Sequence, residues 1–541
     1  MNRKKRTAAV ISSCLTSVLI VSLALSGCGD KTKSGNNLAD VETITENTLP
    51  ITTEDITFDC WMQNLSQGYV KSYNDFEAFK IIAEKTGIKI NFIHPTGAAD
   101  EQLGVMIASN DLPDMINYIW QSKWKQEVEN GVFVELNDYI DKLAPNFKKA
   151  LEEKPEYKKF YYNVYNGKAV AMPTLVGDND RFLLWDGYFI RQDWLEELGL
   201  SMPNTIEEWE TVLKAFRNRD PNKNGEQDEY GFSTLSYMAQ YVFMPAFDIA
   251  NYGYFLSPET GKVTHAILEP RFKDYLTMMN RWYNEGLINP NYLSTSNKEL
   301  DSMVLNNQLG AFHVDNNNSM PKYMQMNPDM KLAAAPYVPS SDGKTYYSYA
   351  NVKKGVRDRG TLITSQCKHV KEAVRYLDYF YSDECATLMN WGVEGDTYGV
   401  DENGNKYFLD SIMKNPEGKT PYEAICKYMT NTGFTGFNSS LASQALEANF
   451  SDSIKKVKED SVNYARATEK DWLMDLIPTT YAEDAEISSY SNDLTTYLDE
   501  MYNKFIMGLE PLDNYDEFVE KAKQLGIEKI IAIYQTSQDR S

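Results

Sequence analysis

The sequence has few of the residues on which thiol and metal chemistry depend. Its 541 residues include six Cys and four His. No Cys-x-x-Cys motif occurs, so neither a zinc site nor a disulfide scaffold is indicated. Removal of an export signal would leave four unmodified cysteines whose pairing the sequence leaves open, namely Cys60, Cys367, Cys385 and Cys426.

Positive charge is also scarce. The chain carries 54 Lys and Arg against 77 Asp and Glu, a net charge of -23. Residues 1–27 hold four basic and no acidic residues, so the remainder is near -27. This excess argues against nucleic acid or an anionic membrane surface as the main partner.

Long apolar runs are confined to the start of the chain. A cationic stretch, Arg3–Arg6, precedes an apolar run from Ala8 to Leu25. This order is typical of a secretory signal peptide, and the run is too short and too rich in Ser for a membrane-spanning helix. Its end, Leu25-Ser26-Gly27-Cys28, resembles a bacterial lipobox, which predicts cleavage after Gly27 and lipidation of Cys28. Residues 28–52 are then a polar tether, and the protein is held on the extracytoplasmic face of the cell membrane.

Hydrophobic periodicity predicts an α/β fold after the tether. Strands and amphipathic helices alternate in the order strand, helix, strand, helix, strand over 56–62, 74–86, 88–92, 99–109 and 114–117. Such alternation indicates a right-handed parallel sheet, whose ligands lie beyond the carboxyl ends of the strands. Trp61, Tyr118 and Trp120 are at those ends. A second α/β unit begins near residue 176, with a capping box at Thr205–Glu208.

Oxygen-bearing side chains alternate in one polar loop. Asp220, Asn222 and Asn224 occupy alternate positions, Gly225 permits a sharp turn, and Glu226 and Asp228 continue the spacing. Hard cations bind six to eight oxygens, and this spacing suits calcium. An EF-hand has Glu at its twelfth position, where this loop has Gly231, so the bidentate carboxylate would come from Asp228 or Glu229. The alternative is a polar turn that ends a helix.

Several motifs together resemble a known family. They keep a fixed order along the chain: Ser109–Asp114, Asn166–Lys168 before Met172-Pro173, Ile190–Leu195, Asp220–Gly231, Trp391–Gly395, Phe505–Gly508, and Gln535 with Asp539-Arg540. The chain resembles the family 1 extracellular solute-binding proteins of ABC importers, in particular the lipoprotein branch related to alginate-oligosaccharide-binding proteins and LipO-type lipoproteins.

The resemblance implies a type II periplasmic-binding-protein-like fold. Two α/β lobes, each with a mainly parallel sheet, are joined by hinge crossovers and bind a sugar between them. The expected amino-terminal lobe comprises 53–174 and about 313–362, and the carboxyl-terminal lobe 175–312 and about 363–541. The resemblance also implies a structural calcium ion at the loop, with the Glu226 backbone carbonyl among its ligands. The implied partners are an oligosaccharide and the ABC permease subunits, and the protein is expected to be a monomer.

Sugar recognition uses aromatic faces and fixed polar groups. The residues expected to bind the ligand are Trp61, Tyr118, Trp120, Trp185, Asp186, Asp315, Trp391 and Glu394. The alternative for each aromatic residue is a place in the core, where we expect Trp194, Trp209 and Trp282.

Two other functions compete with transport. One is an exported glycosidase or polysaccharide lyase, which needs a carboxylate pair or a His, Tyr and Arg set. With 77 acidic residues a pair can always be found, but no motif selects one. The other is a surface sensor or adhesin on the same fold. The motifs favour a binding protein that is not an enzyme.

Overall fold

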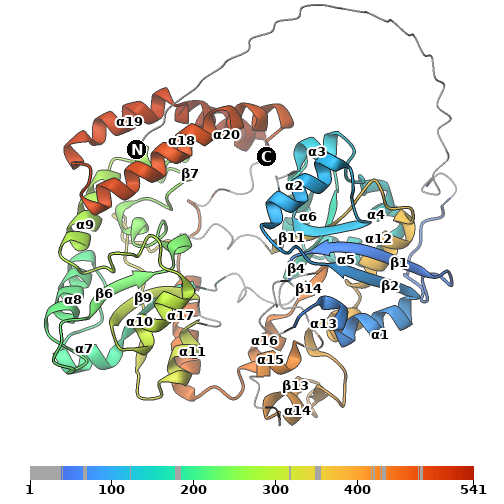
Figure 1. The fold of residues 1–541 in the computed structure, drawn as a ribbon, viewed down its shortest axis with the longest axis horizontal. Helices are drawn as coiled ribbons and strands as arrows, with labels where there is room; N and C mark the ends of the chain where they lie inside the picture. The colour runs from blue at the N-terminus through green and yellow to red at the C-terminus, as the bar shows by residue number, and fades with distance from the viewer. Residues whose placement is uncertain are drawn as a thin grey trace, which may run out of the picture.

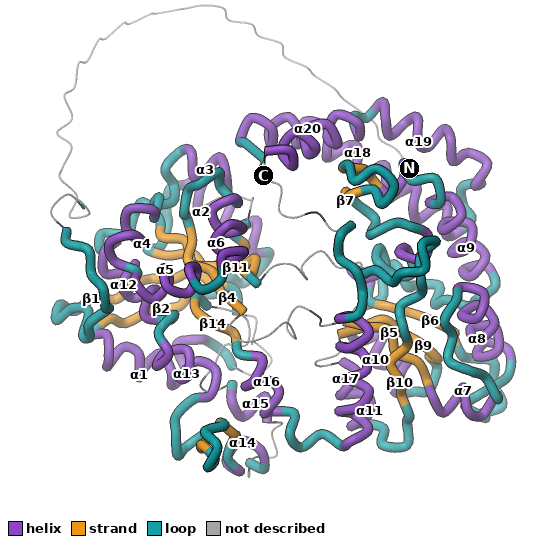
Figure 2. The backbone as a smooth tube through the Cα atoms, turned by 180° about the vertical axis from the view of Figure 1, so that it is seen from behind, coloured by secondary structure: helices purple, strands orange, loops and turns teal. Residues whose placement is uncertain are grey.

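A computed structural model describes residues 38, 41–64, 70–121, 124–176, 184, 186–315, 319–347, 355–415, 417, 421–426, 428, 434–472, 474 and 479–540. Two α/β lobes lie side by side in this structure (Figures 1 and 2). Cys28, Trp185 and the whole leader, residues 1–27, fall outside the described residues. No described helix combines the length and apolar character that crossing a membrane requires.

The first lobe is built on a six-stranded sheet with the order β14-β4-β11-β3-β1-β2. Its strands are β1 (Ile56–Met62), β2 (Ile88–Ile93), β3 (Met115–Ile119), β4 (Ala171–Val176), β11 (Val356–Ile363) and β14 (Gly436–Asn438). The helices around it are α1 (Glu77–Thr86), α2 (Ala99–Ser109), α3 (Lys125–Glu129), α4 (Asn137–Leu143), α5 (Pro145–Glu152), α6 (Pro155–Asn163), α12 (Val370–Tyr379) and α13 (Asp383–Trp391). β1 pairs in parallel with both β2 and β3, which confirms the predicted alternation of strands and helices.

The second lobe is built on a four-stranded sheet with the order β10-β5-β9-β6. Its strands are β5 (Asp186–Arg191), β6 (Tyr230–Thr234), β9 (Leu309–Asp315) and β10 (Leu332–Ala335). β5 pairs antiparallel with β9 and β10, and only β6 and β9 are parallel, so this sheet is less parallel than expected.

Helices complete the second lobe. They are α7 (Gln192–Leu198), α8 (Ile206–Asn218), α9 (Phe272–Asn284), α10 (Asn297–Leu305), α11 (Ser319–Met326), α17 (Asp452–Arg466), α18 (Tyr481–Met507), α19 (Tyr515–Gln524) and α20 (Ile527–Arg540). A hairpin of β7 (Tyr254–Leu256) and β8 (Val263–His265) packs against α20. Trp194, Trp209 and Trp282 are buried here, as predicted for core residues.

A small unit follows α13, seen at the foot of Figure 1. It contains β12 (Tyr398–Val400), β13 (Lys406–Phe408), α14 (Asp410–Met413), α15 (Pro421–Ile425) and α16 (Ser440–Leu446). Trp391, Tyr398 and Phe408 belong to its separate apolar cluster.

The strand pairing differs from the predicted lobe boundaries after residue 312. β10 pairs with β5 and therefore belongs to the second lobe, whereas α12 and α13 pack into the core of the first lobe. The prediction had assigned these segments the other way round. Local periodicity identifies a strand without identifying its partners, and these partners are more than 100 residues away.

The end of the predicted tether contacts the first lobe. Val41 and Ile44 pack against its core, and the Ile44 backbone N–H donates to the Lys142 carbonyl at 2.9 Å. Asn47 Nδ2 donates to the Arg375 carbonyl at 2.7 Å. Residues 41–51 are therefore part of the folded lobe.

Candidate functional site

The chain crosses from the first lobe to the second at the ends of the strands, on one side of each sheet. It leaves the first sheet at the carboxyl end of β4 and enters the second at the start of β5. β11 is antiparallel to both β4 and β3, so β3 and its parallel neighbour β1 also end at that edge. In the second sheet β9 is antiparallel to β5 and parallel to β6, so both end where β5 begins. We call these two rows of strand ends the crossing edges. They include the carboxyl ends of β1 and β3 in the first sheet and of β6 and β9 in the second.

The aromatic candidates of the first lobe are buried behind its crossing edge. Trp61 is 2% exposed and meets the Tyr118 ring edge-on at 5.6 Å between centroids. Tyr118 Oη donates to Asp100 Oδ1 at 3.0 Å, and burial raises the pKa of this phenol. Trp120 is fully buried, and its Nε1 donates to the Arg357 carbonyl at 3.0 Å. In this conformation all three rings pack within the lobe.

Asp186 and Asp315 face each other in the register of β5 and β9. Asp186 is buried, accepts a hydrogen bond from Tyr347 Oη, and lies 3.2 Å from His313 Nε2. Asp315 is half-buried and accepts from Ser319 Oγ at 2.6 Å. Asp186 is thus held in place by its neighbours, and Asp315 is the more accessible carboxylate.

Trp391 and Glu394 lie in the small unit. Trp391 is 7% exposed, and its ring stacks on Phe408 with centroids 4.9 Å apart. Glu394 is exposed. The structure therefore brings Trp391 into an apolar cluster, away from solvent.

The sequence did not identify three further residues at the crossing edges. Gln63 follows β1 and accepts from Arg359 Nη2 at 2.9 Å, and the Arg359 guanidinium lies over the Tyr118 ring at 5.3 Å. Tyr237 follows the end of β6 and is 55% exposed. Position within three residues of a strand's carboxyl end was the signal that would have found Gln63 and Tyr237.

The loop between α8 and β6 is organised by its own side chains. Asp220 accepts from the backbone N–H groups of Asn224, at 3.1 Å, and Gly225, at 3.0 Å. Asn222 Oδ1 also accepts from the Asn224 N–H, at 2.9 Å, and Gly225 has a φ of 84°, which favours glycine. These bonds fold the loop into a tight turn with its oxygens close together.

Glu229 is the unsatisfied group of this loop. Its side chain is fully buried, and neither carboxylate oxygen has a hydrogen-bond partner among the described residues. Burial raises the pKa of this carboxyl, its own backbone N–H nearby lowers it, and the charges of Asp228 and Asp220 raise it further. Buried charges in proteins are normally paired or bound to a metal, so the environment of Glu229 fits a bound cation.

The loop offers oxygen ligands of mixed types. Within the described ranges, no three Asp, Glu, His or Cys side chains form a metal-binding group. The loop oxygens are carboxylates of Asp220, Asp228 and Glu229 together with amides of Asn222 and Asn224. Oxygen ligands of this kind, with no His or Cys, suit a hard cation such as calcium.

Comparison with known proteins identifies the family. Residues 71–386 match the model of the bacterial extracellular solute-binding proteins, and the chain belongs to that family. A curated relative, the fructooligosaccharide ABC transporter substrate-binding protein FusA of Streptococcus pneumoniae serotype 4, is 28% identical over 358 residues, 64% of each chain. Lipoprotein LipO of Bacillus subtilis strain 168 is 24% identical over 62% of this chain and 66% of its own. These matches span just under two thirds of the two relatives.

Solved structures share the fold. Alginate-binding protein AlgQ2 without calcium ion has a TM-score of 0.73 at 24% identity and covers 90% of this chain and 99% of its own. An EF-hand mutant of S. pneumoniae FusA in complex with fructo-nystose has a TM-score of 0.70 at 21% identity, with the same coverage. The expected two-lobed, type II periplasmic-binding-protein-like α/β fold is thereby confirmed.

Proposed function

We propose that this protein is the lipid-anchored, extracytoplasmic substrate-binding component of an ABC importer, and that it captures an oligosaccharide between its lobes and delivers it to membrane permease subunits. The observation that carries the proposal is the arrangement of the crossing edges. Both sheets end in polar and aromatic residues where the chain passes from lobe to lobe. A ligand that contacts both edges favours closure of the hinge, which excludes water and strengthens its hydrogen bonds.

Sequence relatives support a carbohydrate as the ligand. FusA is named as a fructooligosaccharide-binding protein, and the fold is shared with an alginate-binding protein. Both are described as binding proteins, which favours reversible capture over chemical conversion. The eight sequence candidates remain proposed contacts, and in this conformation Asp315 and Glu394 are the described ones most open to a ligand.

A direct binding experiment tests this function. Purified protein is mixed with neutral fructooligosaccharides and acidic alginate oligosaccharides, and its melting temperature and small-angle scattering radius are measured. A bound ligand stabilises by RT ln(1 + [L]/Kd), about 2.7 kcal/mol at 100 Kd, and closure reduces the radius. Chemical conversion of the sugar, or no response to either class, would overturn the proposal.

The lipid anchor is tested separately. Cys28→Ala removes the only thiol of the lipobox-like motif, so the variant is expected in the medium or unprocessed in the membrane. Normal acylation and cell retention of this variant would contradict an anchor at Cys28.

The loop is proposed to hold one structural calcium ion. Asp220, Asn222, Asn224, Asp228 and Glu229 would bind through their side chains, and Glu226 through its backbone carbonyl. Glu226 has an exposed side chain, consistent with a role for its main chain. A bound cation would be a positively charged partner for the buried Glu229 carboxylate.

A further inference from the structure

The turn between α10 and β9 holds the 220–229 loop from outside. Gln308 Nε2 donates to Asp228 Oδ2 at 2.8 Å. Asn222 Nδ2 donates to the Asn307 carbonyl at 2.9 Å. The Tyr230 backbone N–H donates to the Gln308 carbonyl at 2.8 Å, which fixes the exit of the loop as well. Two consecutive residues therefore contact two of the side chains proposed to bind the cation.

These outer bonds decide which atoms of the Asn222 and Asp228 side chains face the loop. Because the Asn222 amide nitrogen points to the turn, its Oδ1 points inward and accepts from the Asn224 N–H. Because Gln308 engages Asp228 Oδ2, Oδ1 is left facing the loop, 3.1 Å from Asn224 Nδ2. Both inward oxygens are thus oriented before any ion arrives.

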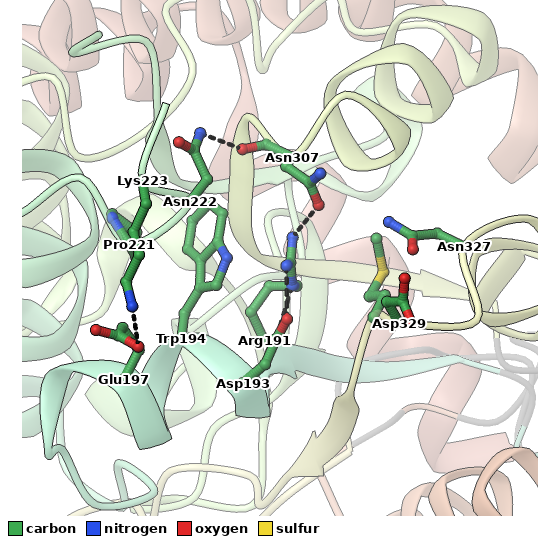
Figure 3. Close-up of a pocket in the computed structure, with 11 residues that line it drawn as sticks. Arg191, Asp193, Trp194, Glu197, Pro221, Asn222, Lys223, Asn307, Asn327 and Asp329 are labelled. Atoms are coloured by element: carbon green, nitrogen blue, oxygen red, sulfur yellow. Dashed lines mark hydrogen bonds and ion pairs between the residues drawn. The ribbon is translucent and has the colours of Figure 1, made fainter. Parts of the chain in front are cut away.

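The turn is itself braced by the end of β5. Asn307 adopts a left-handed conformation with φ 59°, and its Oδ1 accepts from Arg191 Nη1 at 2.8 Å. Arg191 forms two bonds with Asp193, at 2.8 and 2.7 Å, and its guanidinium lies over the Trp194 ring at 4.5 Å. Figure 3 shows the resulting chain from Arg191 through Asn307 to Asn222, along a hollow of about 380 Å³. The buried Arg191 links the loop to the sheet.

We infer that Gln308 is a positioning residue for the cation ligand Asp228, and that the Asn307 carbonyl performs the same role for Asn222. This inference rests on the proposed calcium site. Groups that hydrogen-bond to metal ligands orient them, and their loss typically lowers metal affinity by 10- to 100-fold. Gln308 carries the test because its side chain alone makes the contact.

The test is a calcium titration of the purified, metal-stripped protein by isothermal calorimetry. Gln308→Met keeps the length of the side chain and removes its donor, and we expect the Kd for Ca²⁺ to rise by on the order of 10-fold. The metal-free melting temperature is expected to stay unchanged, because the deleted bond then serves only to orient Asp228. Gln325→Met, at an exposed position on α11, is the matched control and is expected to bind like the wild type.

A second background tests whether Gln308 acts through Asp228. In Asp228→Asn the further change Gln308→Met is expected to have a much smaller effect on the Kd, since residues that share one interaction are not additive. If Gln308→Met does not fold, Gln308→Asn, which keeps the amide on a shorter side chain, is titrated instead and is expected to weaken binding.

The outcomes separate the two proposals. Absence of Ca²⁺ binding by the wild type would remove the calcium site and this inference with it. Wild-type binding with equal affinity in Gln308→Met would overturn the inference alone. A fall in metal-free melting temperature at unchanged Kd would show a purely structural contact and would also overturn it.

Discussion

Each lobe has a fully buried carboxylate, but only the one in the first lobe has hydrogen-bond partners among the described residues. In the first lobe the fully buried Asp378 accepts hydrogen bonds from the Phe147 N–H, at 2.9 Å, and from the side-chain amides of Asn146, at 2.8 Å, and Asn47, at 3.2 Å. In the second lobe the equally buried Glu229 has no partner among the described residues. The first lobe supplies donors to Asp378, whereas a bound cation would be a partner for Glu229.

Removal of divalent cations is the strongest test of this difference. We expect a chelator to lower the stability of the second lobe by about 4 kcal/mol when calcium had been present at 1,000 Kd, with little effect on the first. Differential scanning calorimetry with and without chelator measures it. The double variant Asp220→Ala with Asn224→Ala is expected to lose the response.

The β12–β13 turn offers a matched control for that experiment. Asp401 accepts from the backbone N–H groups of Asn403, at 2.9 Å, and Asn405, at 2.8 Å, in a similar local arrangement without a buried acid beside it. Asp401→Ala should keep the chelator response. A wild type that melts identically with and without chelator would contradict the need of Glu229 for a cation.

The buried acid of the first lobe predicts a pH dependence. Burial raises the pKa of Asp378 from 3.8 to about 7, against the hydrogen bonds from Phe147, Asn146 and Asn47 that lower it. The folded protein therefore holds a proton that the unfolded chain releases above about pH 4. The stabilisation is present below that pH and is lost as the pH rises through 7.

Asp378→Asn isolates this effect. We expect the stability advantage of the wild type over the variant to fall by about 1–3 kcal/mol between pH 4 and pH 8. Melting temperatures of both proteins across that range measure it. Parallel pH curves would show that Asp378 titrates alike in the folded and unfolded states.

A partly buried ion pair joins the two lobes, and we expect it to couple their unfolding. Lys125 on α3 is buried, and its Nζ lies 2.7 Å from Asp484 Oδ2 near the start of α18. It also donates to Thr479 Oγ1, and Asn166 Nδ2 donates to the Thr479 carbonyl at 3.3 Å. Figure 1 shows α18 extending from the second lobe toward α3.

Asp484→Ala leaves the buried Lys125 without its counterion. We expect the free energy of unfolding to fall by about 1–3 kcal/mol. In calorimetry, the melting transitions of the two lobes are expected to lie further apart than in the wild type. Asp460→Ala breaks the exposed pair with Lys456 and is the control, with an expected change below about 0.5 kcal/mol. Equal effects of the two substitutions would argue against a coupling role for Lys125.

The sequence predicted local structure well and non-local structure poorly. Hydrophobic period and capping residues located β1 to β3, and the Thr205 side chain caps α8 through the Glu208 N–H as predicted. The lobe boundaries failed for β10, α12 and α13, because the segments that these elements contact are distant in the sequence.

The candidate site shows the same contrast between local features, which the sequence predicted, and non-local ones, which it did not. Regular spacing within ten residues predicted the loop oxygens, whereas the hydrogen bond from Gln308 to Asp228 comes from a turn 80 residues away. Aromatic residue type also carries no information on burial. Trp120 and Trp391 satisfied the chemical criterion for stacking sugars, yet both pack against other rings in the structure.

The smallest expected change in stability concerns the exposed aromatic residue at a crossing edge. The candidate rings of the first lobe are buried, whereas Tyr237 in the second lobe is 55% exposed just beyond β6. If the second lobe supplies the stacking surface, Tyr237→Ala will weaken oligosaccharide binding by about 1 kcal/mol and change stability by less than about 0.5 kcal/mol. Tyr407→Ala, at a ring 48% exposed in the small unit, is the control and should change neither. The comparison requires a ligand found in the binding screen, titrated against all three proteins by calorimetry. Equal affinities of wild type and Tyr237→Ala would show that Tyr237 does not stack on the ligand. The stacking rings would then be ones that are buried in this conformation and that become exposed when the lobes move.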